Sequence, residues 1–259
     1  MKINIYQIDA FASHVFEGNP AAVCPLDSWL PDATMQSIAV ENNLSETAFF
    51  VNINNVFHIR WFTPIGEVNL CGHATLASAR VIFDELHYTQ PQITFSSKSG
   101  ELQVLKENDQ LIMDFPAQCP VECETPLPLK EAFHHASFQC FKHDDYFLIF
   151  SSESDIRNAS PDMQLLHKLD LRGVCISATG DSYDFVSRFF APKYGIDEDP
   201  VTGSSFTGLI PYWSKRLNKK ELRAKQISER GGEVYCRNMD ERVIIAGKTA
   251  KYLTGTIFI

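Results

Sequence analysis

Hydrophobic and polar residues alternate along several short stretches of this chain, which is the pattern of half-buried β-strands. The run from Ile3 to Phe11 alternates in this way and predicts an opening strand. Two β-rich runs, Thr47 to Val51 and Phe57 to Phe62, are separated by the polar stretch Asn52 to Asn55, which indicates a hairpin. Further strands are predicted at 92–95, 101–104, 111–115, 146–150, 174–177, 183–190 and 243–245, and around Val234.

Helical spacing occurs in fewer places. Asp32 can cap a short helix that has Met35, Ile38 and Ala39 on one face. Longer helices are predicted by the spacing of Leu76, Ala79, Phe83 and Leu86, and of Phe206, Leu209, Ile210, Trp213 and Leu217, and shorter ones at the stretch from Leu129 and at 161–169. Gly208 and Pro211 predict a kink or a shorter element within the last long helix. Strands that alternate with single helices predict an α+β fold in which a curved sheet wraps around a helix.

One pattern occurs twice. The run Arg60-Trp61-Phe62-Thr63-Pro64 returns as Arg188-Phe189-Phe190-Ala191-Pro192, 128 residues later. Each copy leads through an acidic loop to a turn of small residues that opens a helix, Cys71-Gly72-His73-Ala74-Thr75 in the first half and Val201-Thr202-Gly203-Ser204-Ser205 in the second. We therefore expect two similar domains, with one site in the cleft between them.

The expected domains are residues 1–116 and 117–259, and the last strand can cross back to the first half. The stretch from Pro116 to Pro128 holds four prolines, and proline removes strand donors and stops helices. This stretch is therefore the best candidate for the linker.

The two small-residue turns are candidate binding elements. Backbone N–H groups in the first turn of a helix lack internal partners, and the helix dipole adds positive potential there. Gly72 and Gly203 let a ligand approach the backbone closely, so the turns could hold a carboxylate. The alternative is that glycine and serine only cap the helices.

Three side chains could carry proton transfer. Glu46 begins an apolar strand, where partial desolvation would suit a general acid or base. His73 follows Gly72 at a helix start and is expected to be biased toward the neutral form. Asp199 precedes Pro200, which extends its backbone and aims its carboxylate toward the next helix. The alternatives are a solvated strand-end glutamate for Glu46, which the local sequence alone favours, a self-capping histidine for His73 and a solvated acidic loop for Asp199.

Composition excludes several classes of function. There are 32 acidic and 23 basic residues, a net charge of −9, and no basic cluster, which argues against a nucleic-acid partner. No apolar run is long enough to span a bilayer, and the start of the chain lacks the apolar centre of a signal peptide, so a cytoplasmic protein is expected. No P-loop, dinucleotide fingerprint or nucleophile elbow is present, which argues against nucleotide, flavin or esterase chemistry.

Seven cysteines without framework spacing are typical of reduced thiols. Cys119 and Cys123 lack a nearby second pair of ligands, and His134 and His135 point apart on a helix, so no metal site is expected. Cys71 suggests a two-thiol racemase, but the matching loop of the second half, Asp197 to Ser205, contains no cysteine.

These motifs together resemble the phenazine-biosynthesis PhzF-like family, which is related in fold to diaminopimelate epimerase and proline racemase. The resemblance is carried by Asp9-Ala10-Phe11, 16–23, 43–47, Phe62-Thr63-Pro64, 70–77, 199–204, Pro211-Tyr212-Trp213 and 228–232. It implies two similar domains, each a barrel-like sheet around a central helix, and cofactor-independent isomerisation by proton transfer in the cleft. In the phenazine enzyme the substrate is trans-2,3-dihydro-3-hydroxyanthranilate.

By motif position, the resemblance implies that Glu46 is the principal acid/base and that His73 and Asp199 assist it. Gly72, Gly203 and Ser204 would supply donors to a substrate carboxylate, and Asn19, Ser45 and Thr202 complete the substrate-binding set. A homodimer is also expected. Many relatives have Ala-His-Cys where this chain has Ser205-Phe206-Thr207, which affects the expected pocket more than the proton chemistry.

Two rival functions remain open at this stage. One is a thiol-dependent epimerase that uses Cys71, and the other is a non-catalytic protein that binds a small metabolite. The family also occurs where no phenazine is made, so the fold does not identify the substrate.

Overall fold

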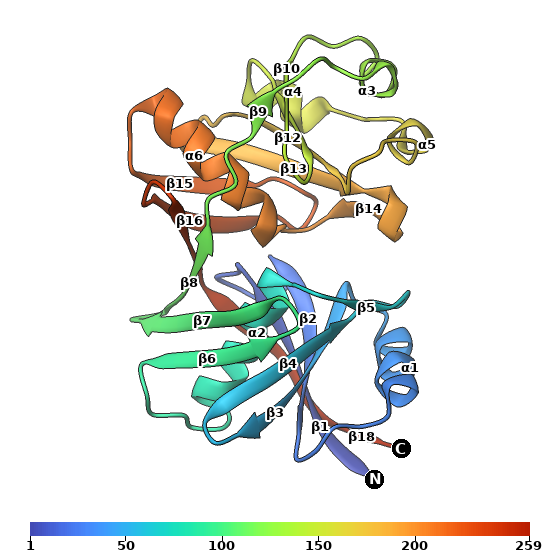
Figure 1. The fold of residues 1–259 in the computed structure, drawn as a ribbon, viewed down its shortest axis with the longest axis vertical. Helices are drawn as coiled ribbons and strands as arrows, with labels where there is room; N and C mark the ends of the chain where they lie inside the picture. Colours follow the sequence, from blue (N-terminus) through green and yellow to red (C-terminus); the bar gives the residue numbers. More distant parts are fainter. The chain divides into compact units, whose positions relative to one another are not determined.

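The computed structural model describes residues 1–259, and the chain forms two compact units. The first unit comprises residues 1–114 and 246–259, and the second comprises residues 115–245. Figure 1 shows strands and helices mixed in each unit, which is an α+β architecture. The predicted fold class is therefore confirmed.

The first unit is a mixed sheet around the helix α2 (Gly72–Asp84). Its strands are β1 (Lys2–Ala10), β2 (Asn19–Leu26), β3 (Glu46–Ile53), β4 (Val56–Phe62), β5 (Glu67–Val68), β6 (Gln92–Ser97), β7 (Gly100–Glu107), β8 (Gln110–Pro116) and β18 (Thr249–Phe258). The pairs β2–β3 and β4–β6 are parallel, whereas β1–β18, β1–β2, β3–β4, β4–β5, β6–β7 and β7–β8 are antiparallel. A second helix, α1 (Asp32–Asn42), packs on β3 and β4.

The second unit repeats this order of elements. Its strands are β9 (Val121–Glu122), β10 (Gln139–Lys142), β11 (Tyr146–Ile149), β12 (Val174–Thr179), β13 (Phe185–Ala191), β14 (Ile196–Asp199), β15 (Glu221–Gln226), β16 (Gly232–Asn238) and β17 (Arg242–Gly247). Its helices are α3 (Leu127–Ala132), α4 (Glu153–Asn158), α5 (Met163–Leu166), α6 (Phe206–Leu217) and the 3₁₀ turns η1 (Pro192–Tyr194) and η2 (Gly203–Ser205). The parallel pairs β11–β12 and β13–β15 match β2–β3 and β4–β6.

Helix α2 is buried on nearly every face because it is built from small and apolar residues. Ala74, Ala77 and Ala79 are fully buried and let the strands approach closely. The two buried hydroxyls are satisfied within the helix, since Thr75 Oγ1 donates to the Cys71 carbonyl at 2.6 Å and Ser78 Oγ donates to the Ala74 carbonyl at 2.7 Å. The helix is therefore a rigid support for its own N-terminus.

The helix α6 runs for 12 residues through Pro211, so the predicted alternative of a shorter element is wrong. Proline has no N–H, which leaves the carbonyl four residues earlier, on Thr207, without its helical partner. The backbone N–H of Gln118 donates to that carbonyl at 3.0 Å. The Thr207 hydroxyl also donates to Gln118 Oε1 at 2.7 Å, so a segment of the predicted linker compensates for the proline.

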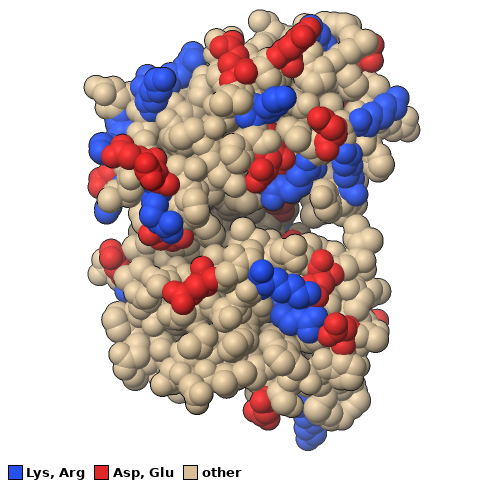
Figure 2. Space-filling view, viewed as in Figure 1, with Lys and Arg blue, Asp and Glu red and all other residues tan.

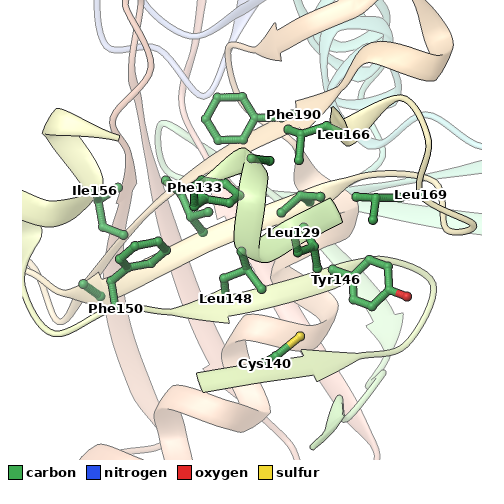
Figure 3. Packing of buried hydrophobic residues seen from close by; sticks show 14 of the residues in the cluster. Leu129, Phe133, Cys140, Tyr146, Leu148, Phe150, Ile156, Leu166, Leu169 and Phe190 are labelled. Atoms are coloured by element: carbon green, nitrogen blue, oxygen red, sulfur yellow. The ribbon is translucent and has the colours of Figure 1, made fainter. Parts of the chain in front are cut away.

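The core of the second unit is largely aromatic and aliphatic. Figure 3 shows Phe133, Phe150 and Phe190 from separate elements close to one another, and the Phe133–Phe150 and Phe133–Phe190 centroid distances are 5.8 and 6.5 Å. Edge-to-face ring pairs of this kind add to the stabilisation that burial provides. This packing fixes the β11–β12–β13 layer that leads to the second small-residue turn.

The two repeated arginines have the same structural role. Arg60 forms a two-bond fork with Glu67 and lies over the Phe62 ring at 5.1 Å. Arg188 forms the same fork with Glu198 and lies over the Phe190 ring at 5.1 Å. The repeat therefore preserves a supporting frame beside each turn.

Candidate active site

Two groups of predicted site residues come together, one in each unit. In the first unit, Asn19 begins β2 and Glu46 begins β3, and the parallel register pairs Ala21 with Glu46. Because parallel strands start at the same edge of a sheet, the two side chains lie close together. His73 is the second residue of α2, and its ring reaches both.

A glycine makes the approach to Asn19 feasible. Gly18 has a φ of +66°, and a Cβ at this position would lie 2.1 Å from the Ala10 carbonyl oxygen. No L side chain fits there, so the turn before β2 requires glycine. The turn delivers Asn19 to the start of β2, where it is fully buried.

The centre of the first group is the contact between His73 and Glu46. The Nε2 atom of His73 lies 3.0 Å from Oε2 of Glu46, and the two residues are only 5% and 9% exposed. Neither atom has a hydrogen-bond partner apart from this contact. Buried polar atoms are nearly always hydrogen-bonded, so such a pair is an unusual feature that a reacting group could satisfy.

The other ring nitrogen of His73 contacts different side chains. Its Nδ1 lies 3.3 Å from Asn19 Nδ2 and 3.6 Å from Cys71 Sγ. Glu46, Cys71 and His73 offer ligand atoms within 4.8 Å of one another. The carboxylate and the sulfur contact opposite nitrogens of one ring, a geometry that suits a proton relay through the imidazole.

The amide of Asn19 can serve both charge states of His73. An amide carries a donor and an acceptor, so Nδ2 serves the neutral ring and the oxygen can serve the imidazolium after the amide turns. Asn19 can therefore remain hydrogen-bonded to His73 when the ring gains or loses a proton.

The charge balance around His73 differs from the sequence expectation. Burial alone lowers the pKa of His73, but Cys71 and the Glu46 carboxylate, through their charge and hydrogen bonding, raise it well above the ordinary value. The expected bias of His73 toward the neutral form is therefore wrong. The two side chains raise its pKa by more than burial lowers it, and the positive potential of the helix N-terminus does not reverse this. Burial and the charge of Glu46 together raise the pKa of the Cys71 thiol.

Ser45 and Gly72 lie beside this group. Ser45 precedes Glu46 and is half-buried, and Gly72 is the half-buried first residue of α2. No side chain caps this helix, so its first-turn amides are not used by a local capping residue.

The second unit brings together Asp199, at the end of β14, and Thr202, both buried. The Thr202 hydroxyl donates to Oδ2 of Asp199. Gln226, which is fully buried at the end of β15, joins the two: its Oε1 accepts from the Thr202 N–H at 3.0 Å and its Nε2 donates to the Asp199 carbonyl at 2.7 Å. Gln226 fixes the turn that carries Asp199.

Gly203 is buried in η2, and Ser204 beside it is half-buried. The Ser204 hydroxyl accepts a hydrogen bond of 2.9 Å from Nη2 of Arg172. Arg172 in turn forms a fork with Asp145, with a distance of 2.9 Å from its Nε to Oδ1. The predicted turn is thus attached to a charged pair from a different part of the unit.

Sequence reasoning missed Gln226, Arg172 and Asp145. A signal existed for Gln226, because it continues the inward series of Leu222 and Ala224 along β15 and is the polar member of that series. Arg172 lies in a loop between helix α5 and β12 and has no such pattern. Its role follows only from the fold.

The structure accounts for Ser205-Phe206-Thr207, the segment at which this chain departs from the Ala-His-Cys of many relatives. Phe206 is fully buried and packs on Phe185 with a centroid distance of 6.0 Å. The Ser205 hydroxyl donates to the Thr202 carbonyl at 2.8 Å. Phe206 therefore belongs to the core, and the neighbouring hydroxyls stabilise the turn.

Acidic and basic side chains are interspersed on the face drawn in Figure 2. None of the helices combines the length and the apolar character that crossing a bilayer demands.

With this geometry established, comparison with known proteins gives the family. The family model described as phenazine biosynthesis-like protein matches residues 8–255. An uncharacterized isomerase of Pseudomonas aeruginosa is 49% identical over 259 residues and covers 100% of both chains. A crystal structure of a PhzF-family phenazine biosynthesis protein from Enterococcus faecalis is 44% identical, covers 100% of both chains and has a TM-score of 0.97.

The chain therefore belongs to the phenazine biosynthesis-like, or PhzF-like, family, and its class is that of an isomerase. A more distant structure, a probable proline racemase from Agrobacterium radiobacter, has a TM-score of 0.65 at 7% identity and covers 99% of this chain and 92% of its own. At that identity it supports the shared fold alone. The predictions of family, fold and enzyme class are confirmed.

Proposed function

We propose that this protein is a cofactor-independent isomerase that moves a proton on a small carboxylate-bearing substrate by acid/base catalysis. The observation that carries the proposal is the buried contact of 3.0 Å between Glu46 Oε2 and His73 Nε2, two atoms without any other hydrogen-bond partner. A general base must come within hydrogen-bond reach of the proton it removes, and a buried carboxylate paired only with an imidazole suits this role.

The proposed chemistry balances within the substrate. Glu46 removes a proton from one carbon, and the electron pair delocalises toward a conjugated or carboxylate group. The same proton, or one exchanged with solvent, then returns to another carbon from Glu46 or from the His73 imidazolium. The substrate is neither oxidised nor reduced, and the enzyme returns to its starting charge.

The remaining predicted residues have supporting roles in this proposal. Asp199, held by Thr202 and Gln226, assists the proton relay or holds an amino or hydroxyl group. Gly72, Gly203 and Ser204 donate to the substrate carboxylate, and Asn19 and Ser45 complete the set. A single substrate site in the cleft between the halves stays a prediction from the sequence, as does a homodimer.

The family resemblance suggests trans-2,3-dihydro-3-hydroxyanthranilate as the first substrate to test. Wild-type protein is incubated with this acid in D₂O and followed by proton NMR. The proposal predicts a rearranged product that carries deuterium at the reacting carbon. Tight binding without any deuterium entry would instead favour the non-catalytic binding protein.

A thiol-dependent epimerase is the second candidate, because Cys71 Sγ lies 3.6 Å from His73 Nδ1. Against it, burial and Glu46 raise the pKa of that thiol, which disfavours the thiolate nucleophile or base. Cys71→Ser separates the two: the acid/base proposal predicts substantial remaining deuterium entry, and complete loss would favour the thiol mechanism.

A further inference from the structure

The two units place different charges next to corresponding small-residue turns, with Arg172 one residue before the counterpart of Glu46, Gly173. In the first unit, Glu46 at the start of β3 contacts the second residue of α2, His73. In the second unit, Arg172, two residues before β12, contacts Ser204, which follows Gly203 as His73 follows Gly72. One unit carries a carboxylate that can accept a proton, and the other carries a guanidinium that cannot.

Arg172 is held in a fixed orientation. Two hydrogen bonds join it to Asp145, which is only 2% exposed, and its guanidinium lies over the Phe189 ring at 5.4 Å. A planar fork on a carboxylate with an aromatic ring below it leaves little freedom. The third contact, from Nη2 to Ser204 Oγ, is therefore directed by the first two.

This contact sets the polarity of the Ser204 hydroxyl. A hydroxyl has one hydrogen to donate and two lone pairs to accept, and an arginine can only donate. The Ser204 oxygen must therefore accept from Arg172. The hydroxyl hydrogen of Ser204 does not donate to another group of the protein. Since Ser204 is half-buried, this hydrogen can be offered to a ligand oxygen.

Direct binding of an anion to Arg172 is disfavoured by its surroundings. Burial alone lowers the pKa of Arg172, but Asp145, Asp144 and Asp199 raise it overall, so three carboxylates act on this guanidinium. These carboxylates would repel an incoming anion electrostatically. The guanidinium is thus better suited to act through Ser204 than to bind substrate itself.

We propose that Arg172, held by Asp145, is a positioning residue that makes the Ser204 hydroxyl a donor to an oxygen of an anionic substrate. This rests on the proposed function, and it adds that a charged pair of the second unit orients the Ser204 hydroxyl toward the carboxylate. A carboxylate should be preferred over the corresponding neutral amide, because a hydrogen bond to a charged acceptor is the stronger one.

The test measures binding of anthranilate and of anthranilamide by calorimetry, since these probes differ only in the carboxylate. Three variants are compared with wild type: Ser204→Ala, the charge-balanced pair Asp145→Asn with Arg172→Gln, and the combination of all three changes. The pair Arg60→Gln with Glu67→Gln removes a similar fork that does not touch Ser204 and serves as the control.

Wild type should prefer anthranilate. Ser204→Ala and the Asp145/Arg172 pair should each weaken anthranilate binding roughly tenfold to a hundredfold and leave anthranilamide nearly unchanged. Because Arg172 acts through Ser204, the combined variant should bind anthranilate as Ser204→Ala does, within about twofold. The control pair should bind like wild type.

The proposal is overturned if wild type does not prefer anthranilate or if the Asp145/Arg172 pair binds anthranilate like wild type. It is also overturned if the loss of anthranilate affinity in the combined variant equals the sum of the losses in Ser204→Ala and in the Asp145/Arg172 pair, expressed as free energies. Should the pair fail to fold, Arg172→Lys keeps the charge beside Asp145 but lacks the fork, and it should still lose severalfold in carboxylate preference. Binding needs no turnover. Preserved carboxylate preference without deuterium exchange would therefore contradict the isomerase and leave this inference standing.

Discussion

His73 contacts different partners through its two ring nitrogens, Glu46 through Nε2 and Asn19 and Cys71 through Nδ1. All four side chains are buried, so each contact is stronger than it would be in water. A proton that arrives on one nitrogen can leave from the other. At the scale of residues, this ring is the component that connects the carboxylate with the rest of the first group.

The first prediction concerns the charge of this ring. The pKa of His73 is raised in the folded protein, so its protonation stabilises the fold fully below its unfolded value of about 6.5, and this contribution is lost as pH rises through the folded pKa. The free energy of unfolding of wild type minus that of His73→Gln should therefore fall as pH rises from about 6.

Urea unfolding at several pH values measures this difference, and ring proton NMR follows the titration directly. Glu46→Gln is the control, because removal of the carboxylate should lower the pKa of His73. A free-energy difference that stays constant or grows as pH rises would contradict the assigned charge balance.

At the scale of elements, α6 depends on close packing around Gly208. A Cβ added to Gly208 would lie 2.6 Å from the Phe147 ring and 3.3 Å from the Gln118 carbonyl oxygen. Phe147 is only 4% exposed, so its ring has little room to move. The small residue lets β11 and the Gln118 segment approach the helix.

The second prediction is that Gly208→Ala destabilises the protein although alanine favours helices. Overpacking costs about 1–3 kcal/mol, which exceeds the helix gain of about 1 kcal/mol from replacing glycine. Urea denaturation should show the loss. Gly66→Ala, where no atom lies within 4 Å of the added Cβ, should change stability by less than about 0.5 kcal/mol. Equal stability of both variants would show that Phe147 is not a fixed neighbour.

The elements themselves were largely predictable from local patterns. The spacing of Leu76, Ala79 and Phe83 predicts α2, and the helix capped by Asp32 is observed as α1. The environment of Glu46 was not predictable, because its burial depends on β2 and α2, which are distant in sequence. The continuation of α6 through Pro211 was not predictable for a similar reason, because the donor to the free Thr207 carbonyl comes from Gln118.

At the scale of the whole molecule, the repeat conserves the supporting frame and varies the chemistry. Both units keep the order of strands and the arginine fork over a phenylalanine. The sequence repeat indicated this frame. It could not indicate that the second unit uses Arg172, Asp145 and Gln226, since none of these has a counterpart of its own type in the first unit's cluster.

The third prediction concerns the cysteines over the whole chain. Cys119 is exposed and Cys123 is partly buried, whereas Cys24, Cys71, Cys140, Cys175 and Cys236 are buried. Burial raises the pKa of Cys24 to about 12, and thiols in such surroundings react slowly. Native protein should therefore show one fast-reacting thiol, which Cys119→Ser removes.

A thiol-reactive chromophore counts the fast thiols, and iodoacetamide-treated protein should keep its deuterium-exchange activity. Several fast thiols in the native protein would contradict the buried positions. Loss of activity on alkylation, together with an inactive Cys71→Ser variant, would support the thiol mechanism.

The most direct test of the central claim is the deuterium-exchange rate of Glu46→Gln. This change keeps the shape of the side chain but removes the group that accepts the proton. With trans-2,3-dihydro-3-hydroxyanthranilate in D₂O, the rate should fall by at least roughly a hundredfold, while Glu41→Gln, an exposed change of the same kind, should exchange like wild type. Exchange by a folded Glu46→Gln variant at the wild-type rate would contradict the account.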